Sequence, residues 1–125
     1  MGSSFIDYRG RGFWSHDAYI ERFLSLLANA PAPLPAQDWL GDAREHWRLQ
    51  ASGVFHGWIH PRFDEYLSSD ERRLAVLALV VDIREHAGSE GDLRQTCDLV
   101  EKLLRGELTT DAASPLDYMV KLKVK

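Results

Sequence analysis

Apolar residues recur at intervals of three and four early in the chain, which is the spacing of one face of a helix. The residues that share this spacing are Ile20, Phe23, Leu24 and Leu27. Just ahead of them, Ser15 is a favourable N-cap, and Asp17 places a carboxylate where the helix dipole favours it. The pattern predicts an amphipathic helix of about four turns that begins after Ser15.

A second helix is predicted from Pro35 to Ser52, because proline suits a first turn and Gly53 is placed to end the helix. Its inward stripe is expected to hold Trp39 or Leu40, Ala43, Trp47 and Ala51. The proline-rich residues 30–35 cannot continue the first helix, since proline lacks an amide donor, and they predict a stiff connector inside one domain. Residues 54–67 are predicted to form an aromatic-rich loop with one helical turn at Phe63–Leu67.

Residues 74–81 are all apolar. Such a run covers every direction around a helix, so we expect a central helix, about residues 69–87, enclosed by the others. Ser68 and Glu71 have the spacing of a capping box, and Gly88 marks the end. A buried strand would also suit the apolar run, but these start and stop signals favour the helix.

A further helix and two short strands complete the prediction. Ser89 and Asp92 repeat the capping-box spacing, and Gly106 is placed to close the helix that follows. Residues 4–9 are expected to form a short strand that stops at a glycine-rich turn. Residues 120–125 alternate apolar side chains with lysines, and this period of two predicts a terminal strand that could pair with the first one.

These elements predict a mainly α fold, a compact bundle of four to five helices around the central apolar helix at about 69–87. A small two-stranded ribbon formed by the termini is the expected addition. The length of 125 residues suits a single globular domain, 1–125. The composition, 45% hydrophobic and 27% charged with a net charge of −4, excludes a disordered acidic tail, a collagen-like repeat and a disulfide scaffold.

The single cysteine and the distribution of apolar residues bear on the compartment. Cys97 cannot form an internal disulfide, which is typical of a reducing compartment. No stretch reaches the roughly 18 apolar residues that a membrane span needs. The first five residues also lack the basic and apolar regions of a signal peptide. We therefore expect a cytoplasmic protein that does not interact with a membrane.

His56 and His60 have the spacing of a zinc-binding pair, which needs both imidazoles on one helix face and a third ligand. Gly57 and Pro61 weaken a helix there, and no second ligand cluster follows. No complete catalytic signature is present either, so we expect no metal, no cofactor and no enzymatic activity. A small hydrolase or metal-binding enzyme that uses His56 and His60, with Asp64 nearby, is kept as an alternative.

The segment 9–14 interleaves two arginines with two aromatic residues, which is the mixture that a single-stranded nucleic-acid contact needs. The chain carries 19 acidic against 15 basic side chains, so its net charge repels phosphate. The segment is better interpreted as a turn whose arginines pair with nearby acids and whose aromatic rings enter the core. We expect no nucleic-acid partner.

Acidic and aromatic residues gather in the middle of the chain. Asp38, Asp42 and Glu45 lie at helical spacing on one flank of the second predicted helix. The neighbouring loop adds Asp64, Glu65 and Tyr66. Carboxylates beside partly exposed aromatic rings are typical of a surface that binds a basic protein partner. An ordinary solvated face, with the four tryptophans in the core, explains the pattern equally well.

The first fifty residues resemble the immunity proteins of contact-dependent growth inhibition and related polymorphic toxin systems in bacteria. The resemblance rests on the segment Tyr8–Trp14, on Asp17, on Trp39-Leu40-x-Asp42 and on Trp47. It implies a cytoplasmic, non-catalytic protein that binds the C-terminal domain of one cognate toxin. A single copy in a 1:1 heterodimer is the expected assembly. A small regulatory or scaffold module that binds another cellular protein has the same sequence features and stays open.

Overall fold

The computed structural model describes residues 2–30, 38–108 and 119–122, with side chains for all of these except Asp38 and 119–122. The described residues form three strands and five helices. The strands are β1 (Ser3–Tyr8), β2 (Arg11–His16) and β3 (Met119–Leu122). The helices are α1 (Asp17–Asn29), α2 (Asp38–Gln50), α3 (Phe63–Tyr66), α4 (Asp70–Glu85) and α5 (Gly91–Arg105). The prediction of a mostly helical fold with a small antiparallel sheet is confirmed.

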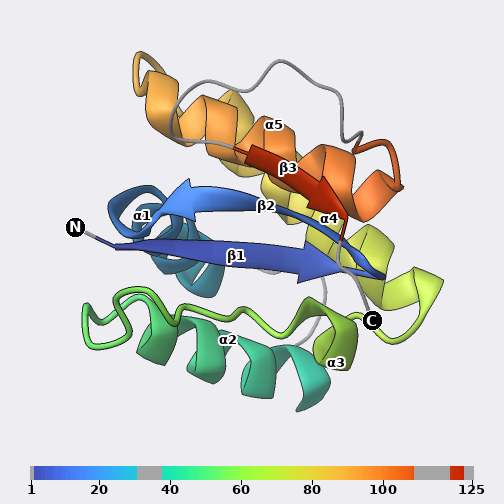
Figure 1. Ribbon diagram of the computed structural model, residues 1–125. Coiled ribbons are helices and arrows are strands. Elements are labelled where there is room, and N and C mark those ends of the chain that lie inside the picture. The colour runs from blue at the N-terminus through green and yellow to red at the C-terminus, as the bar shows by residue number, and fades with distance from the viewer. Residues whose placement is uncertain (1, 31–37, 109–118, 123–125) are drawn as a thin grey trace.

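The sheet has the order β1-β2-β3, with β2 in the middle (Figure 1). The predicted pairing of the two terminal strands is therefore wrong, because β3 pairs with β2 and not with β1. The glycine-rich turn that was predicted after residue 9, at residues 10–12, is also shorter than expected, because Arg11 and Gly12 belong to β2. Arg9 and Gly10 have φ angles of 51° and 83°, which allows a two-residue hairpin loop and places Ile6 opposite Phe13. The predicted strand residues 123–125 and the connector 31–37 lie outside the described residues.

The helices begin differently from the capping signals. Ser15 belongs to β2, and α1 starts at Asp17 after His16 because the strand ladder continues to that residue. In α4 the cap is Ser69, whose hydroxyl accepts a hydrogen bond from the Arg72 amide at 3.3 Å. Helix α5 has no side-chain cap, so the predicted capping box at Ser89 is wrong. Its predicted end is confirmed, since Gly106 has a φ of 74°.

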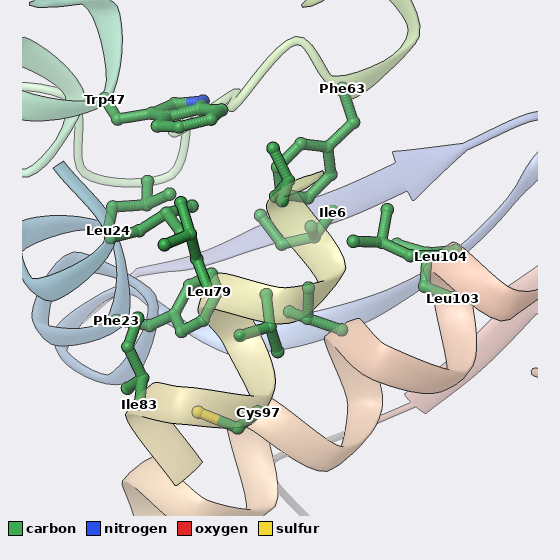
Figure 2. Close-up of a cluster of buried hydrophobic side chains, with 14 of the residues drawn as sticks. Ile6, Phe23, Leu24, Trp47, Phe63, Leu79, Ile83, Cys97, Leu103 and Leu104 are labelled. Carbon is green, nitrogen blue, oxygen red and sulfur yellow. The ribbon is translucent and has the colours of Figure 1, made fainter. Parts of the chain in front are cut away.

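The helix at about 69–87 was expected to be enclosed on every side, and this is wrong for one stripe of α4. Leu74 is 54% exposed and Ala78 is exposed as well. Helix α1 packs against more elements, namely α2, α4, α5 and β2, and Phe23 and Leu24 are buried on it (Figures 1 and 2). It also has an exposed stripe, which holds Ala18, Arg22 and Asn29. None of the helices within the described ranges is both long and apolar enough to cross a membrane.

Candidate functional site

Helices α2 and α3 pack side by side around the indole of Trp47. This side chain is 0% exposed, and its Nε1 donates a hydrogen bond to the Pro61 carbonyl at 2.8 Å. The rings of Phe63 and Tyr66 each lie with their centroids 6.3 Å from that of Trp47. Because Trp47 contacts both ends of the single turn of α3, it holds this short helix in place against α2. Figure 2 shows Trp47 and Phe63 in this cluster.

The exposed side of these two helices carries four of the predicted site residues. We call this surface the α2–α3 face and define it by Asp42, Glu45, Glu65 and Tyr66. Burial raises the pKa of the Tyr66 hydroxyl, the charges of Glu65 and Asp42 raise it further, and that of Arg62 opposes them. Carboxylates from both helices therefore act on one phenol, which stays protonated at neutral pH and can donate a hydrogen bond.

The carboxylates of the α2–α3 face differ in their partners. Glu45 lies 3.4 Å from Arg48, and Glu65 lies 3.7 Å from Arg62. Both pairs are exposed, so each contributes little to stability and can exchange its partner at low cost. Asp42 is exposed and has no ion pair with any other residue in the described ranges. It is the carboxylate most available to an incoming cation.

The other two predicted site residues stand apart. Asp64 lies on α3 but faces the β1–β2 hairpin, where its Oδ1 accepts a hydrogen bond from the Arg9 amide at 2.8 Å. It therefore supports the hairpin turn rather than the α2–α3 face. Asp38 is the first residue of α2, and its side chain lies outside the described part of the chain.

The four tryptophans have four different environments. Trp47 is sealed in the core, and Trp14 is half-buried with its ring 5.2 Å from that of Phe5. Trp39 is half-buried beside the α2–α3 face, with the Arg72 guanidinium 5.0 Å from its ring centre. Trp58 is 82% exposed. The expectation that all four tryptophans could lie in the core is wrong for Trp58, and the position of Trp39 beside carboxylates stays a prediction, since its ring neighbour is Arg72.

A second exposed feature, which was not predicted from the sequence, lies at and beyond the C-terminal end of α2. Leu49, Val54 and Trp58 are 54%, 74% and 82% exposed, although they are large and apolar. The sequence signal is the pair of glycines within this segment, Gly53 and Gly57, and the structure gives them positive φ angles of 92° and 81°. Such glycines shape a surface loop rather than a core segment.

The three residues of the enzyme alternative face three different elements. His56 Nε2 lies 3.6 Å from Glu21 on α1, and His60 Nε2 lies 3.3 Å from Asp7 on β1. Asp64, as described above, contacts the hairpin turn. The fold therefore does not assemble a shared site from them. Within the described ranges, no group of three potential metal ligands comes together either.

The loop that carries His56 is held by a buried polar network. The Asp17 carboxylate accepts hydrogen bonds from the Ser4 hydroxyl at 2.6 Å and from the Gly57 amide at 2.7 Å. The Ser4 hydroxyl in turn accepts one from the Ile59 amide at 3.1 Å. Asp17 thus connects β1, α1 and the loop, which is why it is buried at the start of a helix.

Cys97 lies in the core (Figure 2), and burial raises the pKa of its thiol from 9.0 to about 12, with the charge of Asp98 acting in the same direction. Between these pH values the folded protein keeps a proton that the unfolded chain releases. The contribution of the protonated Cys97 thiol to stability is therefore complete below pH 9 and declines as the pH rises toward 12.

At pH 8 we expect iodoacetamide to label Cys97 only in denaturant, as measured by mass spectrometry. Equal labelling rates with and without denaturant would contradict this burial.

Comparisons with protein-family models, with curated proteins and with solved structures found no match to this chain.

Proposed function

We propose that this protein is a cytoplasmic immunity protein that neutralises a cognate bacterial toxin, without catalysis of its own. It would bind the toxin's C-terminal domain as a 1:1 heterodimer and inhibit it through the α2–α3 face. The observation that carries the proposal is the convergence of Asp42, Glu65 and the Tyr66 phenol on a rigid surface held by Trp47. The resemblance of the first fifty residues to immunity proteins supports the same conclusion.

The proposed partner is a cationic domain, and a nuclease toxin is the clearest case because it needs basic side chains to bind its substrate. Asp42 would meet these cations first, while Glu45 and Glu65 would exchange their exposed arginine partners for those of the toxin. Opposite charges of this kind speed encounter more than they add affinity. The half-buried rings of Tyr66 and Trp39 would supply the affinity, since buried aromatic residues dominate most interfaces.

The identity of the partner can be tested in cells. We expect co-expression with the C-terminal domain of a toxin encoded beside this gene to restore growth, and the two proteins to purify together at a 1:1 ratio. Continued growth arrest, together with separate elution of two folded proteins, would overturn the immunity function. A regulatory or scaffold role would then be the better interpretation, because Leu49, Val54 and Trp58 offer an exposed apolar surface to another protein.

The use of the α2–α3 face can be tested by charge reversal. Replacing Asp42 and Glu45 by lysine is expected to slow association with the toxin domain by about tenfold at low salt, because electrostatic steering contributes one or more decades to the on-rate. The association rate of this variant should also depend less on salt than that of the wild type. Stopped-flow or surface plasmon resonance measurements would show both effects.

The matched control reverses Asp82 and Glu85 on α4, which have the same three-residue spacing and are exposed. We expect this control to associate at a rate within about twofold of the wild type, since steering depends on charges near the interface. Equal slowing in both variants would indicate a general charge effect. No slowing in the Asp42/Glu45 variant would remove the α2–α3 face from the proposal.

A further inference from the structure

Four arginines from four separate elements line one cavity of about 240 Å³. Arg9 is in the hairpin turn, Arg11 begins β2, Arg73 is on α4, and Arg105 ends α5. The other described lining residues are apolar or neutral, and none of them is acidic. Figure 1 shows the hairpin turn, the start of α4 and the end of α5 at the same end of the molecule. We call this site the arginine cavity.

The fold holds the rim of the arginine cavity in a defined position. Arg9 adopts a left-handed backbone conformation with a φ of 51°, which is uncommon for a residue other than glycine. Its amide donates to Asp64 at 2.8 Å, and its guanidinium lies 5.0 Å from the Tyr8 ring centre. Burial raises the pKa of the Tyr8 hydroxyl, the charges of Arg9 and Arg73 oppose that rise, and those of Asp64 and Asp70 add to it. Arg9 and Arg73 therefore both lie close enough to act on the Tyr8 hydroxyl in the cavity wall.

The interactions within the protein use only some of the arginine donors. Arg11 donates from Nη1 to the Leu108 carbonyl at 2.8 Å, which is a neutral acceptor. Arg73 donates from Nη1 to the Leu104 carbonyl at 3.2 Å, near the end of α5. These two bonds stabilise the backbone after the helix, but a guanidinium has five N–H donors. Most donors of Arg11 and Arg73 thus remain available for a ligand.

The nearby carboxylates neutralise the arginines only in part. Asp70 is shared, because it lies 3.7 Å from Arg9 and 3.4 Å from Arg73. Glu101 accepts a hydrogen bond from Arg105 at 3.0 Å and also pairs with Arg84. Arg84 lies outside the cavity and has Asp98 as a second partner at 3.0 Å. Two carboxylates, Asp70 and Glu101, therefore pair with three of the four cavity arginines, and Arg11 has no carboxylate partner among the described residues. A positive charge is left over at the cavity.

We propose that the arginine cavity binds a phosphate group, either as the free ion or as a small phosphomonoester. The guanidinium matches phosphate because its planar fork can donate two parallel hydrogen bonds to two oxygens. The volume of 240 Å³ is several times the roughly 30 Å³ that one water occupies in the liquid, so a phosphate with a small sugar can enter. This inference is independent of the proposed toxin partner.

Calorimetric titration with inorganic phosphate, at constant ionic strength, tests the proposal. We expect saturable binding of one phosphate, and we expect the variants Arg9→Gln and Arg105→Gln each to weaken it by about tenfold, since a charged hydrogen bond contributes that much. The matched control is Arg94→Gln, an exposed arginine on the same helix as Arg105 that does not line the cavity. It should bind phosphate within about twofold of the wild type.

The source of the phosphate group is distinguished by a parallel titration with ribose 5-phosphate. Tighter binding than inorganic phosphate identifies a phosphomonoester, and equal binding identifies the free ion. A variant that fails to fold is recognised by circular dichroism.

A second measurement needs only the wild-type protein, namely protection of arginines from modification by phenylglyoxal. Phosphate should protect Arg9, Arg11 and Arg105, but not Arg94, from this reagent, as mapped by mass spectrometry. Absence of saturable binding, or equal protection of Arg94, would overturn the proposal.

Discussion

Replacing Trp47 by alanine is expected to lower the free energy of unfolding by about 4 kcal/mol, because deletion of a large buried aromatic side chain leaves a cavity in the core. The indole is 0% exposed and bridges α2 to Phe63 and Tyr66 on α3. Its loss also leaves the Pro61 carbonyl without the hydrogen bond from Nε1. Urea unfolding followed by circular dichroism measures the loss as a lower midpoint at an unchanged slope.

The control for this variant is Trp58→Ala. Trp58 is 82% exposed, so its replacement is expected to change the free energy of unfolding by no more than about 0.5 kcal/mol. Both variants remove an indole, and only one removes packing. If the two variants unfolded at the same urea concentration, the placement of Trp47 as the contact between α2 and α3 would be wrong.

Replacing Asp17 by alanine is expected to lower the free energy of unfolding by about 3 kcal/mol, because a hydrogen bond to a charged group contributes roughly 1.5–3 kcal/mol and two are lost. The donors left behind are the Ser4 hydroxyl and the Gly57 amide, both of which contact the buried carboxylate. Loss of this carboxylate frees Gly57 from α1 and removes the partner that orients the Ser4 hydroxyl toward Ile59. Amide hydrogen exchange at Gly57 and Ile59 should therefore accelerate more than exchange in α5.

Two substitutions sharpen the test of Asp17. Asp17→Asn keeps the size of the side chain but removes its charge and replaces one acceptor with a donor, so we expect it to be destabilising as well. Asp42→Ala removes an exposed aspartate without an ion pair in the described ranges, and should change stability by no more than about 0.5 kcal/mol. Unfolding of Asp17→Asn at the wild-type midpoint would show that the carboxylate charge contributes nothing to the fold.

The stability prediction for Trp47 and the association prediction for Asp42 separate stability from binding on the same helix. Trp47 and Asp42 both belong to α2, yet one is sealed and the other is exposed. A change at Trp47 alters the surface by displacing α3. A change at Asp42 alters the charge of the surface and leaves its shape intact. An effect of Asp42 on partner association is therefore an effect of charge.

The candidate face was predictable in part, because helical periodicity is local. Asp42 and Glu45 were expected on an outward flank of the helix whose inward stripe includes Ala43 and Trp47, and the burial of these residues confirms that arrangement. The single turn at residues 63–66 was also predicted. The direction of Asp64 was not predictable, since it depends on the hairpin turn at Arg9, which is distant in sequence.

The arginine cavity was not predictable at all. Arg9 and Arg11 are neighbours in a glycine-rich segment and were expected to pair with acids nearby in the sequence. This expectation is wrong, because Arg9 pairs with Asp70, which is distant in sequence, and Arg11 donates to the Leu108 carbonyl. The approach of Arg73 and Arg105 depends on how α4 and α5 pack beside the sheet, and no local pattern encodes that packing.

The sequence by itself determined where most helices lie, which faces of α1, α2 and α5 turn inward, and where α5 ends at Gly106. These properties depend on side chains three or four residues apart and on the conformational freedom of one glycine. Only the tertiary structure decided that β2 is the central strand, that α1 packs against more elements than α4 does, and that four arginines meet in one cavity. Each of these depends on contacts between distant segments, whose energies are settled only when the whole core packs.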